Sequence, residues 1–114
     1  MTRHDPLVAI LHMRDFTLKA LALSKSKTRA DLESDELLRL ALTHLVELVG
    51  EAASRVPAEV QGKYPQIEWP KIISMRNRLI HGYDFIDYDI LWNAITENLP
   101  LLLDELKHIL PSGE

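Results

Sequence analysis

Apolar side chains recur at helical spacing from about Ser34 to Arg55 and cover more than one face of the helix that this spacing predicts. The apolar residues are Leu37, Leu38, Leu40, Ala41, Leu42, Leu45, Val46, Leu48, Val49, Ala52, Ala53 and, just past the end, Val56. Asp35 and Glu36 suit the first turn, because the positive end of the helix dipole stabilises acidic groups there. A helix this apolar is expected to be buried on two sides, by its own bundle and by a partner chain.

A first helix is predicted before this segment, and a connector after it. The first helix begins at Pro6, a residue favoured in the first turn, with Asp5 as its cap, and runs through Leu23. SKSKTRA, at residues 24–30, then breaks the spacing as a polar loop. VPAEVQGKYPQIEWP, at residues 56–70, contains three prolines and holds at most a short helix, so we interpret it as a connector within one domain.

Two further helices are predicted in the second half of the chain. Pro70 can open a helix over KIISMRNRLIH, which Gly82 would end as the residue just past its C-terminus. A last helix begins near Asp87 and carries apolar residues in a 3-4 repeat. Pro100 lies inside this helix and should kink it or leave a carbonyl without a donor.

These segments together predict an all-α protein, because glycine is scarce at four residues and no long run alternates apolar and polar residues. The expected architecture is a bundle of four main helices plus a possible short helix. With 114 residues, it should form one domain over residues 1–114, with Trp69 and Trp92 as packing anchors.

The composition narrows the classes of function. The chain has no cysteine, which excludes disulfides, thiolate metal sites and a cysteine nucleophile. The N-terminal residues lack the continuous apolar core of a signal peptide, and no stretch is long enough to span a membrane. We therefore expect a soluble, cytoplasmic protein that makes no membrane contact.

The basic residues are unevenly distributed along this acidic chain, whose formal net charge is -4. Residues 71–81 contain three Lys or Arg residues and no acid, and this segment ends in the sequence RNRLIHGY at residues 76–83. If the protein binds an anion, this segment is the first candidate. Arg78 and Lys71 are then candidates for contacts with that anion, and the family resemblance described below implies that these contacts would be with RNA phosphates.

The residue types at positions 76–83 suit phosphodiester cleavage without a metal. A histidine can exchange a proton with a ribose hydroxyl near neutral pH, and an arginine stabilises the charge that grows on the phosphate. On a straight helix, at roughly 100° per residue, Asn77 and His81 share a face while Arg76 points about 140° away from His81. Either the helix unwinds near Gly82, or Arg76 and His81 meet across two chains. A two-fold dimer would bring two copies of Arg76 and two copies of His81 into one groove.

A purely structural interpretation stays open. A histidine and arginines in the last turn of a helix interact favourably with its dipole, and Gly82 would then only stop the helix. Glu47 and Glu51 are expected to form a solvated or dimer-facing stripe. The remaining histidines show no metal-ligand spacing, so neither a metal nor a cofactor is predicted.

Arg76, His81 and Tyr83 match the pattern R-x-x-x-x-H-x-Y, and the chain resembles HEPN-domain ribonuclease toxins of the HepT type. LVELVGEAASRVP, at residues 45–57, and YDFIDYDILW, at residues 83–92, also resemble that family. The resemblance implies a HEPN-like helical bundle and a homodimeric, metal-independent endoribonuclease. It implies that Arg76 and His81 are catalytic and that Asn77 supports them.

The resemblance also implies a partner and a modification. The protein would be the toxin of a toxin-antitoxin pair, and a cognate minimal nucleotidyltransferase would be the antitoxin. The antitoxin would inactivate it by transferring AMP onto Tyr83, where a bulky anion would block the groove. Two sets of alternatives stay open. Tyr83 could instead be a packed aromatic residue that closes the helix end. The chain could instead be a non-catalytic module that docks a nucleotidyltransferase and holds nucleotide or RNA, or a plain structural bundle.

Overall fold

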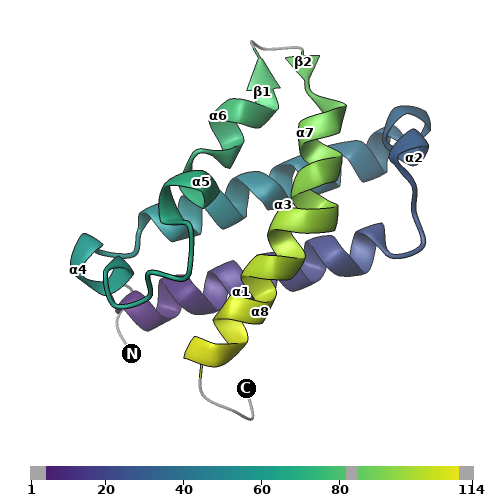
Figure 1. Cartoon of the computed structure of the whole chain (residues 1–114). Coiled ribbons are helices and arrows are strands. Elements are labelled where there is room, and N and C mark those ends of the chain that lie inside the picture. Colours follow the sequence, from purple (N-terminus) through teal and green to yellow (C-terminus); the bar gives the residue numbers. More distant parts are fainter. Residues whose placement is uncertain (1–4, 82–84, 111–114) are drawn as a thin grey trace.

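The computed structural model describes residues 5–81 and 85–110 and confirms the all-α fold (Figure 1). In chain order the elements are α1 (Pro6–Ser24), α2 (Arg29–Ser34), α3 (Glu36–Ser54), α4 (Ala58–Gln61), α5 (Trp69–Ile73), α6 (Met75–Leu79), β1 (Ile80–His81), β2 (Phe85–Ile86), α7 (Tyr88–Asn93), the π-helical turn η1 (Ala94–Asn98) and α8 (Leu99–Ile109). Within the described residues, no helix is both long enough and apolar enough to cross a membrane.

Each of the two long helices begins after an aspartate cap, of which the sequence predicted the first. Asp5 accepts a hydrogen bond from the backbone N–H of Leu7 at 2.8 Å, which confirms the predicted start of α1. Asp35 accepts one from the N–H of Leu38 at 3.0 Å. The second long helix therefore begins at Glu36, two residues later than predicted.

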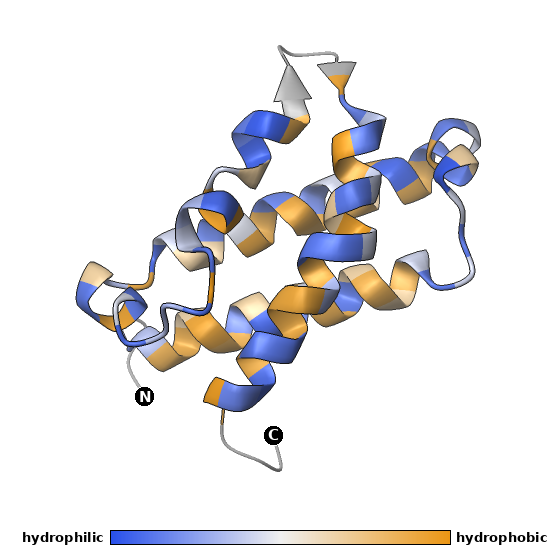
Figure 2. Cartoon of the chain, in the orientation of Figure 1, coloured by the Kyte–Doolittle hydropathy of each residue, from blue (hydrophilic) through white to orange (hydrophobic). Residues whose placement is uncertain are grey.

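Helix α3 is the centre of the bundle. It packs along α1, while α5 and α6 rest against it, and the continuous run of α7, η1 and α8 crosses both α3 and α1 (Figure 1). Apolar residues recur along α1, α3 and α8 (Figure 2). Leu42, Val46 and Val49 of α3 are fully buried, whereas Leu37 and Leu40 are 80% and 52% exposed. The protomer thus buries one face of α3 and leaves two large leucines uncovered near its start.

The polar loop predicted over residues 24–30 is too long, because residues 29–34 form the short helix α2. The carboxylate of Asp31 accepts hydrogen bonds from the backbone N–H of Thr28 at 2.7 Å and from its hydroxyl at 3.2 Å. The backbone hydrogen bond also lowers the pKa of Asp31. Leu32 is the one buried residue of α2, so the segment lacks the apolar repeat that marks a helix in the sequence.

The helix predicted from Pro70 to His81 is interrupted at Ser74 and ends two residues earlier than predicted. The chain forms two short helices, α5 and α6, with Ser74 between them, and α6 ends at Leu79. Ile80 and His81 form a strand that pairs antiparallel with Phe85 and Ile86. Gly82, the predicted helix stop, lies outside the described residues.

Pro100 disturbs the last helix as expected, and the disturbance takes the form of the π-helical turn η1. Pro100 has no N–H to give to the carbonyl four residues earlier. In the turn before it, the N–H of Leu99 reaches back five residues to the carbonyl of Ala94, and the hydroxyl of Thr96 donates to the carbonyl of Trp92 at 2.8 Å.

Of the two predicted packing anchors, Trp69 is buried and Trp92 is half-buried against the core. The indole N–H of Trp69 donates to the carbonyl of Tyr64 at 3.1 Å, which ties the connector to the start of α5.

Helices α3 and α5 approach each other closely at Gly50. A Cβ atom at this position would lie 3.0 Å from the backbone oxygen of Ile72 and 3.4 Å from that of Ile73. A backbone oxygen cannot move aside as a flexible side chain can. Gly50 therefore allows α5, and α6 after it, to lie directly on α3.

Gly50→Ala is expected to lower the free energy of unfolding by about 1 kcal/mol, because an overpacking cost of roughly 1–3 kcal/mol outweighs the gain in helix propensity. Gly62→Ala is the matched control. Gly62 has a φ of -63°, and a Cβ atom there would lie at an ordinary 3.6 Å from its neighbours. Urea unfolding of both variants measures the difference, and equal stability of the two would contradict the close approach.

Candidate functional site

Residues 76–81, the described part of the R-x-x-x-x-H-x-Y motif, lie at one end of the bundle, on α6 and the strand that follows it (Figure 1). Arg76, Asn77 and Arg78 belong to the five-residue helix α6, and His81 ends β1. The backbone N–H of Asp87 donates to the carbonyl of Leu79 at 2.9 Å and so ties the end of α6 to the start of α7. Because α6 ends at Leu79, the helical geometry that would place Asn77 and His81 on one face does not apply.

Arg76 is exposed and bound to an acid of the central helix. Its Nε donates to Oε2 of Glu47 on α3 at 3.1 Å, and the two side chains are 60% and 24% exposed. The sequence places Glu47 in a polar stripe of α3, but it gives no sign that the partner is the arginine of the motif. Glu47 is thus the residue near the site that sequence reasoning missed.

The side chain of Arg78 makes different contacts from that of Arg76. Its Nη2 donates to the carbonyl of Lys71 at 3.1 Å, and its side chain is half-buried, whereas Asn77 is exposed. Arg78 also borders a hollow of about 330 Å³ between α6 and the run of α7 and η1. The hollow is lined by Met75, Arg78, Asp89, Ile90, Asn93, Ala94 and Asn98.

The backbone of His81 pairs with Phe85, on the short ladder described above. Tyr83, the predicted modification site, lies outside the described residues. The structure therefore brings Arg76 next to Glu47 and leaves the contacts of the other two motif side chains undescribed.

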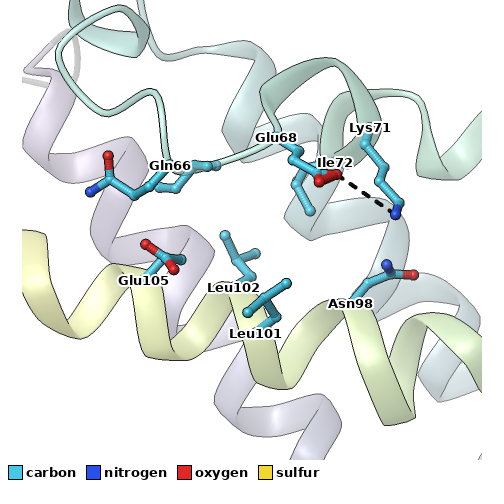
Figure 3. A pocket seen from close by; sticks show the side chains of 9 residues that line it. Gln66, Glu68, Lys71, Ile72, Asn98, Leu101, Leu102 and Glu105 are labelled. Atoms are coloured by element: carbon cyan, nitrogen blue, oxygen red, sulfur yellow. Dashed lines mark ion pairs between the residues drawn. The ribbon is translucent and has the colours of Figure 1, made fainter.

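A second, smaller cavity of about 60 Å³ lies between the start of α5 and the face of α8 (Figure 3). Leu101, Leu102 and Glu105 come from α8, and Glu68 and Lys71 form an ion pair at 3.7 Å on the opposite side. Asn98 borders this cavity and the larger hollow, so the two adjoin along η1 and α8.

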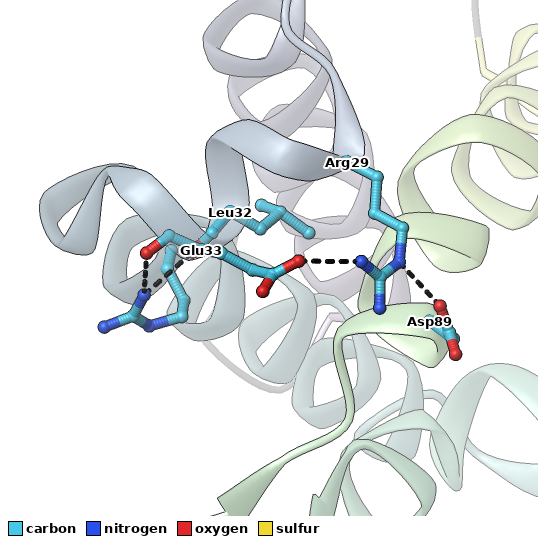
Figure 4. Close-up of polar contacts among 5 residues, drawn as sticks. Arg29, Leu32, Glu33 and Asp89 are labelled. Carbon is cyan, nitrogen blue, oxygen red and sulfur yellow. Dashed lines mark hydrogen bonds and ion pairs between the residues drawn. The ribbon is translucent and has the colours of Figure 1, made fainter.

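Arg29 ties α2 to the start of α7 (Figure 4). It lies between Asp89 and Glu33, with ion-pair distances of 2.6 and 3.0 Å. The hydrogen bond with Asp89 raises the pKa of Arg29 above its ordinary value. Arg39 donates to the carbonyls of Leu32 and Glu33 and so fixes the end of α2 against α3.

Comparison with known proteins identifies the family. The family model of HepT-like ribonucleases matches residues 7–109. "Putative RNase TTE0752" of Caldanaerobacter subterraneus subsp. tengcongensis is 35% identical over 80 residues, which are 70% of this chain and 71% of that protein. The chain belongs to the HepT-like ribonuclease family.

Two further relatives agree with this HepT-like membership. "Probable ribonuclease HepT" of Thermococcus cleftensis is 32% identical over 72 residues, 63% of this chain and 66% of that protein. "Putative RNase MJ1380" of Methanocaldococcus jannaschii is 24% identical over 107 residues, 94% of this chain and 98% of that protein. No solved structure gives a significant match.

In this HepT-like chain, the described residues contain no group of three or more His, Cys, Asp or Glu side chains that could hold a metal ion. Among the motif side chains that the structure describes, Arg76 contacts the central helix through its ion pair with Glu47. The geometry therefore offers an oriented, exposed guanidinium at the end of the bundle, which suits binding of a phosphate.

Proposed function

We propose that this HepT-like protein is a metal-independent endoribonuclease and the toxin of a toxin-antitoxin pair, with Arg76 and His81 as its catalytic residues. The observation that carries the proposal is the match to the HepT-like family over residues 7–109, within which Arg76, His81 and Tyr83 have the R-x-x-x-x-H-x-Y spacing. The exposed guanidinium of Arg76 supports it, because RNA can reach that group.

The proposed reaction needs one base and one acid. One His81 accepts the proton of a ribose 2′-hydroxyl, and the 2′-oxygen bonds to the neighbouring phosphorus while the bond from phosphorus to the 5′-oxygen breaks. The departing 5′-oxygen takes a proton from a second, protonated His81. Arg76 stabilises the charge on the phosphate oxygens. The products are a 2′,3′-cyclic phosphate and a 5′-hydroxyl.

A homodimer would supply the second histidine, and the surface of α3 suggests where it forms. Leu37 and Leu40 are 80% and 52% exposed near the start of α3. Leu40 and Glu47 are seven residues apart, so they share a face of the helix about 10 Å from each other along its axis. A second copy that covers these leucines would approach the ion pair of Glu47 and Arg76.

Asn77 and Arg78 have supporting roles in the proposal. Asn77 is exposed beside Arg76 and is a polar support for the bound phosphate. Arg78 donates a hydrogen bond to the carbonyl of Lys71, so its side chain is oriented differently from that of Arg76. In the proposal it adds positive charge near the RNA.

Regulation is proposed through Tyr83. A cognate minimal nucleotidyltransferase antitoxin would transfer AMP from ATP onto the tyrosine hydroxyl, with release of pyrophosphate. The added phosphate would be two residues from His81, where it would occupy the positive charge of Arg76 and block RNA.

The first prediction concerns cleavage. An end-labelled RNA in excess EDTA should be cut by unmodified wild-type protein, with a 2′,3′-cyclic phosphate end, and His81→Ala should cut at least about a hundredfold more slowly because its proton-transfer group is gone. Circular dichroism checks that the variant is folded. If neither protein cuts any RNA, the catalytic proposal fails, and the chain is better described as a module that docks the nucleotidyltransferase.

The second prediction concerns the dimer. Leu37→Lys should shift the protein toward monomer in size-exclusion chromatography with light scattering, because a charge would replace an apolar contact. Leu101→Lys is the matched control, since Leu101 is 60% exposed but lies on α8. A dimer that Leu101→Lys disrupts and Leu37→Lys leaves intact would show that α3 is the wrong surface.

The third prediction concerns the modification. Incubation with the cognate transferase and ATP should add the mass of AMP to wild-type protein and not to Tyr83→Phe, because the phenylalanine lacks the accepting hydroxyl. Intact-mass spectrometry measures both, and Tyr64→Phe serves as a control tyrosine away from the motif. An equal mass increase in wild type and Tyr83→Phe would assign the modification to another residue.

A further inference from the structure

Two ion pairs among the described residues join helices that are distant in the sequence. They are Arg29 with Asp89 and Arg76 with Glu47. The other ion pairs connect residues one to four positions apart. The pair of Glu47 and Arg76 is therefore a tertiary contact, and it involves the arginine that the proposed reaction needs.

We propose that Glu47 is a positioning residue, which holds the guanidinium of Arg76 in the direction required for the phosphate. This inference rests on the proposed function. Arginine presents one N–H on Nε and two on each terminal nitrogen. Glu47 binds Nε at 3.1 Å. Among the side chains that the structure describes, none contacts the two terminal nitrogens, so this edge of the guanidinium can bind two phosphate oxygens.

The support comes from the helix that carries Glu47. Arg76 lies on α6, which has only five residues and ends in a strand, so its own helix fixes it weakly. Glu47 lies on the 19-residue helix α3 beside Val46, whose exposure is 0%. Gly50, three residues further on, is the point of closest approach to α5. The carboxylate of Glu47 is thus carried by a packed helix and contacts an exposed side chain on a short one.

The negative charge of Glu47 opposes the attraction between Arg76 and RNA. A carboxylate next to the guanidinium reduces the local positive charge and so weakens RNA binding. An arginine that served only to bind RNA would not be expected to have a carboxylate as its neighbour. A group that fixes direction improves the reaction step even where it does not improve binding, because catalysis depends on orientation in the transition state.

Substitution of Glu47 separates these effects. Glu47→Gln keeps an oxygen acceptor for Nε and removes the charge, so it should retain kcat within about threefold and bind RNA equally or more tightly. Glu47→Ala removes the acceptor, so kcat should fall about tenfold. Its Kd for an RNA that is 2′-O-methylated and cannot be cut should not rise. A lower kcat without weaker binding is a result that loss of an RNA contact would not give.

Glu36→Ala is the matched control, because Glu36 is on the same helix and pairs with Arg39 at 3.6 Å, away from the motif. It should retain the wild-type kcat. If Glu47→Ala has the same kcat as Glu36→Ala, the positioning role is wrong. If Glu47→Gln is as slow as Glu47→Ala, the carboxylate itself takes part in proton transfer, and the inference is again overturned.

A spectroscopic measurement tests the contact independently of cleavage. The Nε–H signal of Arg76 in an NMR spectrum, assigned with Arg76→Lys, should shift between wild type and Glu47→Ala, and Glu36→Ala should leave it unchanged. An unchanged signal in Glu47→Ala would refute the positioning contact whatever the activity. A shift in a protein that cuts no RNA would refute the proposed function and leave the contact in place.

Discussion

The close approach of α5 to α3 at Gly50 is the constraint on which the motif region depends. Because this residue has no side chain, the carbonyl of Ile72 can lie where a Cβ atom would be only 3.0 Å away. Helix α6 begins two residues after α5 ends, so its place is fixed by the same contact. Glu47 is three residues before Gly50 and therefore on a neighbouring part of the helix surface. The ion pair with Arg76 forms where the two elements are held together.

Features with a local cause could be predicted from the sequence. Asp5, Asp35 and Asp87 each accept a hydrogen bond from an N–H two or three residues later, and each was expected at or near a helix start. The apolar repeats of the long helices gave the fold class in the same way, because the side chains that must be buried recur every three or four residues. Both the caps and the apolar repeats can be recognised from a few residues that are close together in the sequence.

Features that depend on distant partners could not be predicted. The helix at the motif ends early because Ile80 pairs with Ile86 and the N–H of Asp87 binds the carbonyl of Leu79, and neither bond has a signal in the sequence of the helix itself. The contact of Arg76 with Glu47 joins residues 29 positions apart. A helical projection of the motif contains none of these partners, so it could predict neither the end of α6 at Leu79 nor the contact of Arg76 with Glu47.

The break after Leu79 has a consequence for how a composite site would form. Arg76 is on a helix and His81 on a strand, so the orientation of each is set by a different element. The exposed Leu40 shares a face of α3 with Glu47. A partner chain that covered this face would exclude water from the ion pair, and the attraction between its charges would strengthen as the surroundings became less polar. Dimer formation and the orientation of Arg76 would then be coupled through α3, with no need for a change within the protomer.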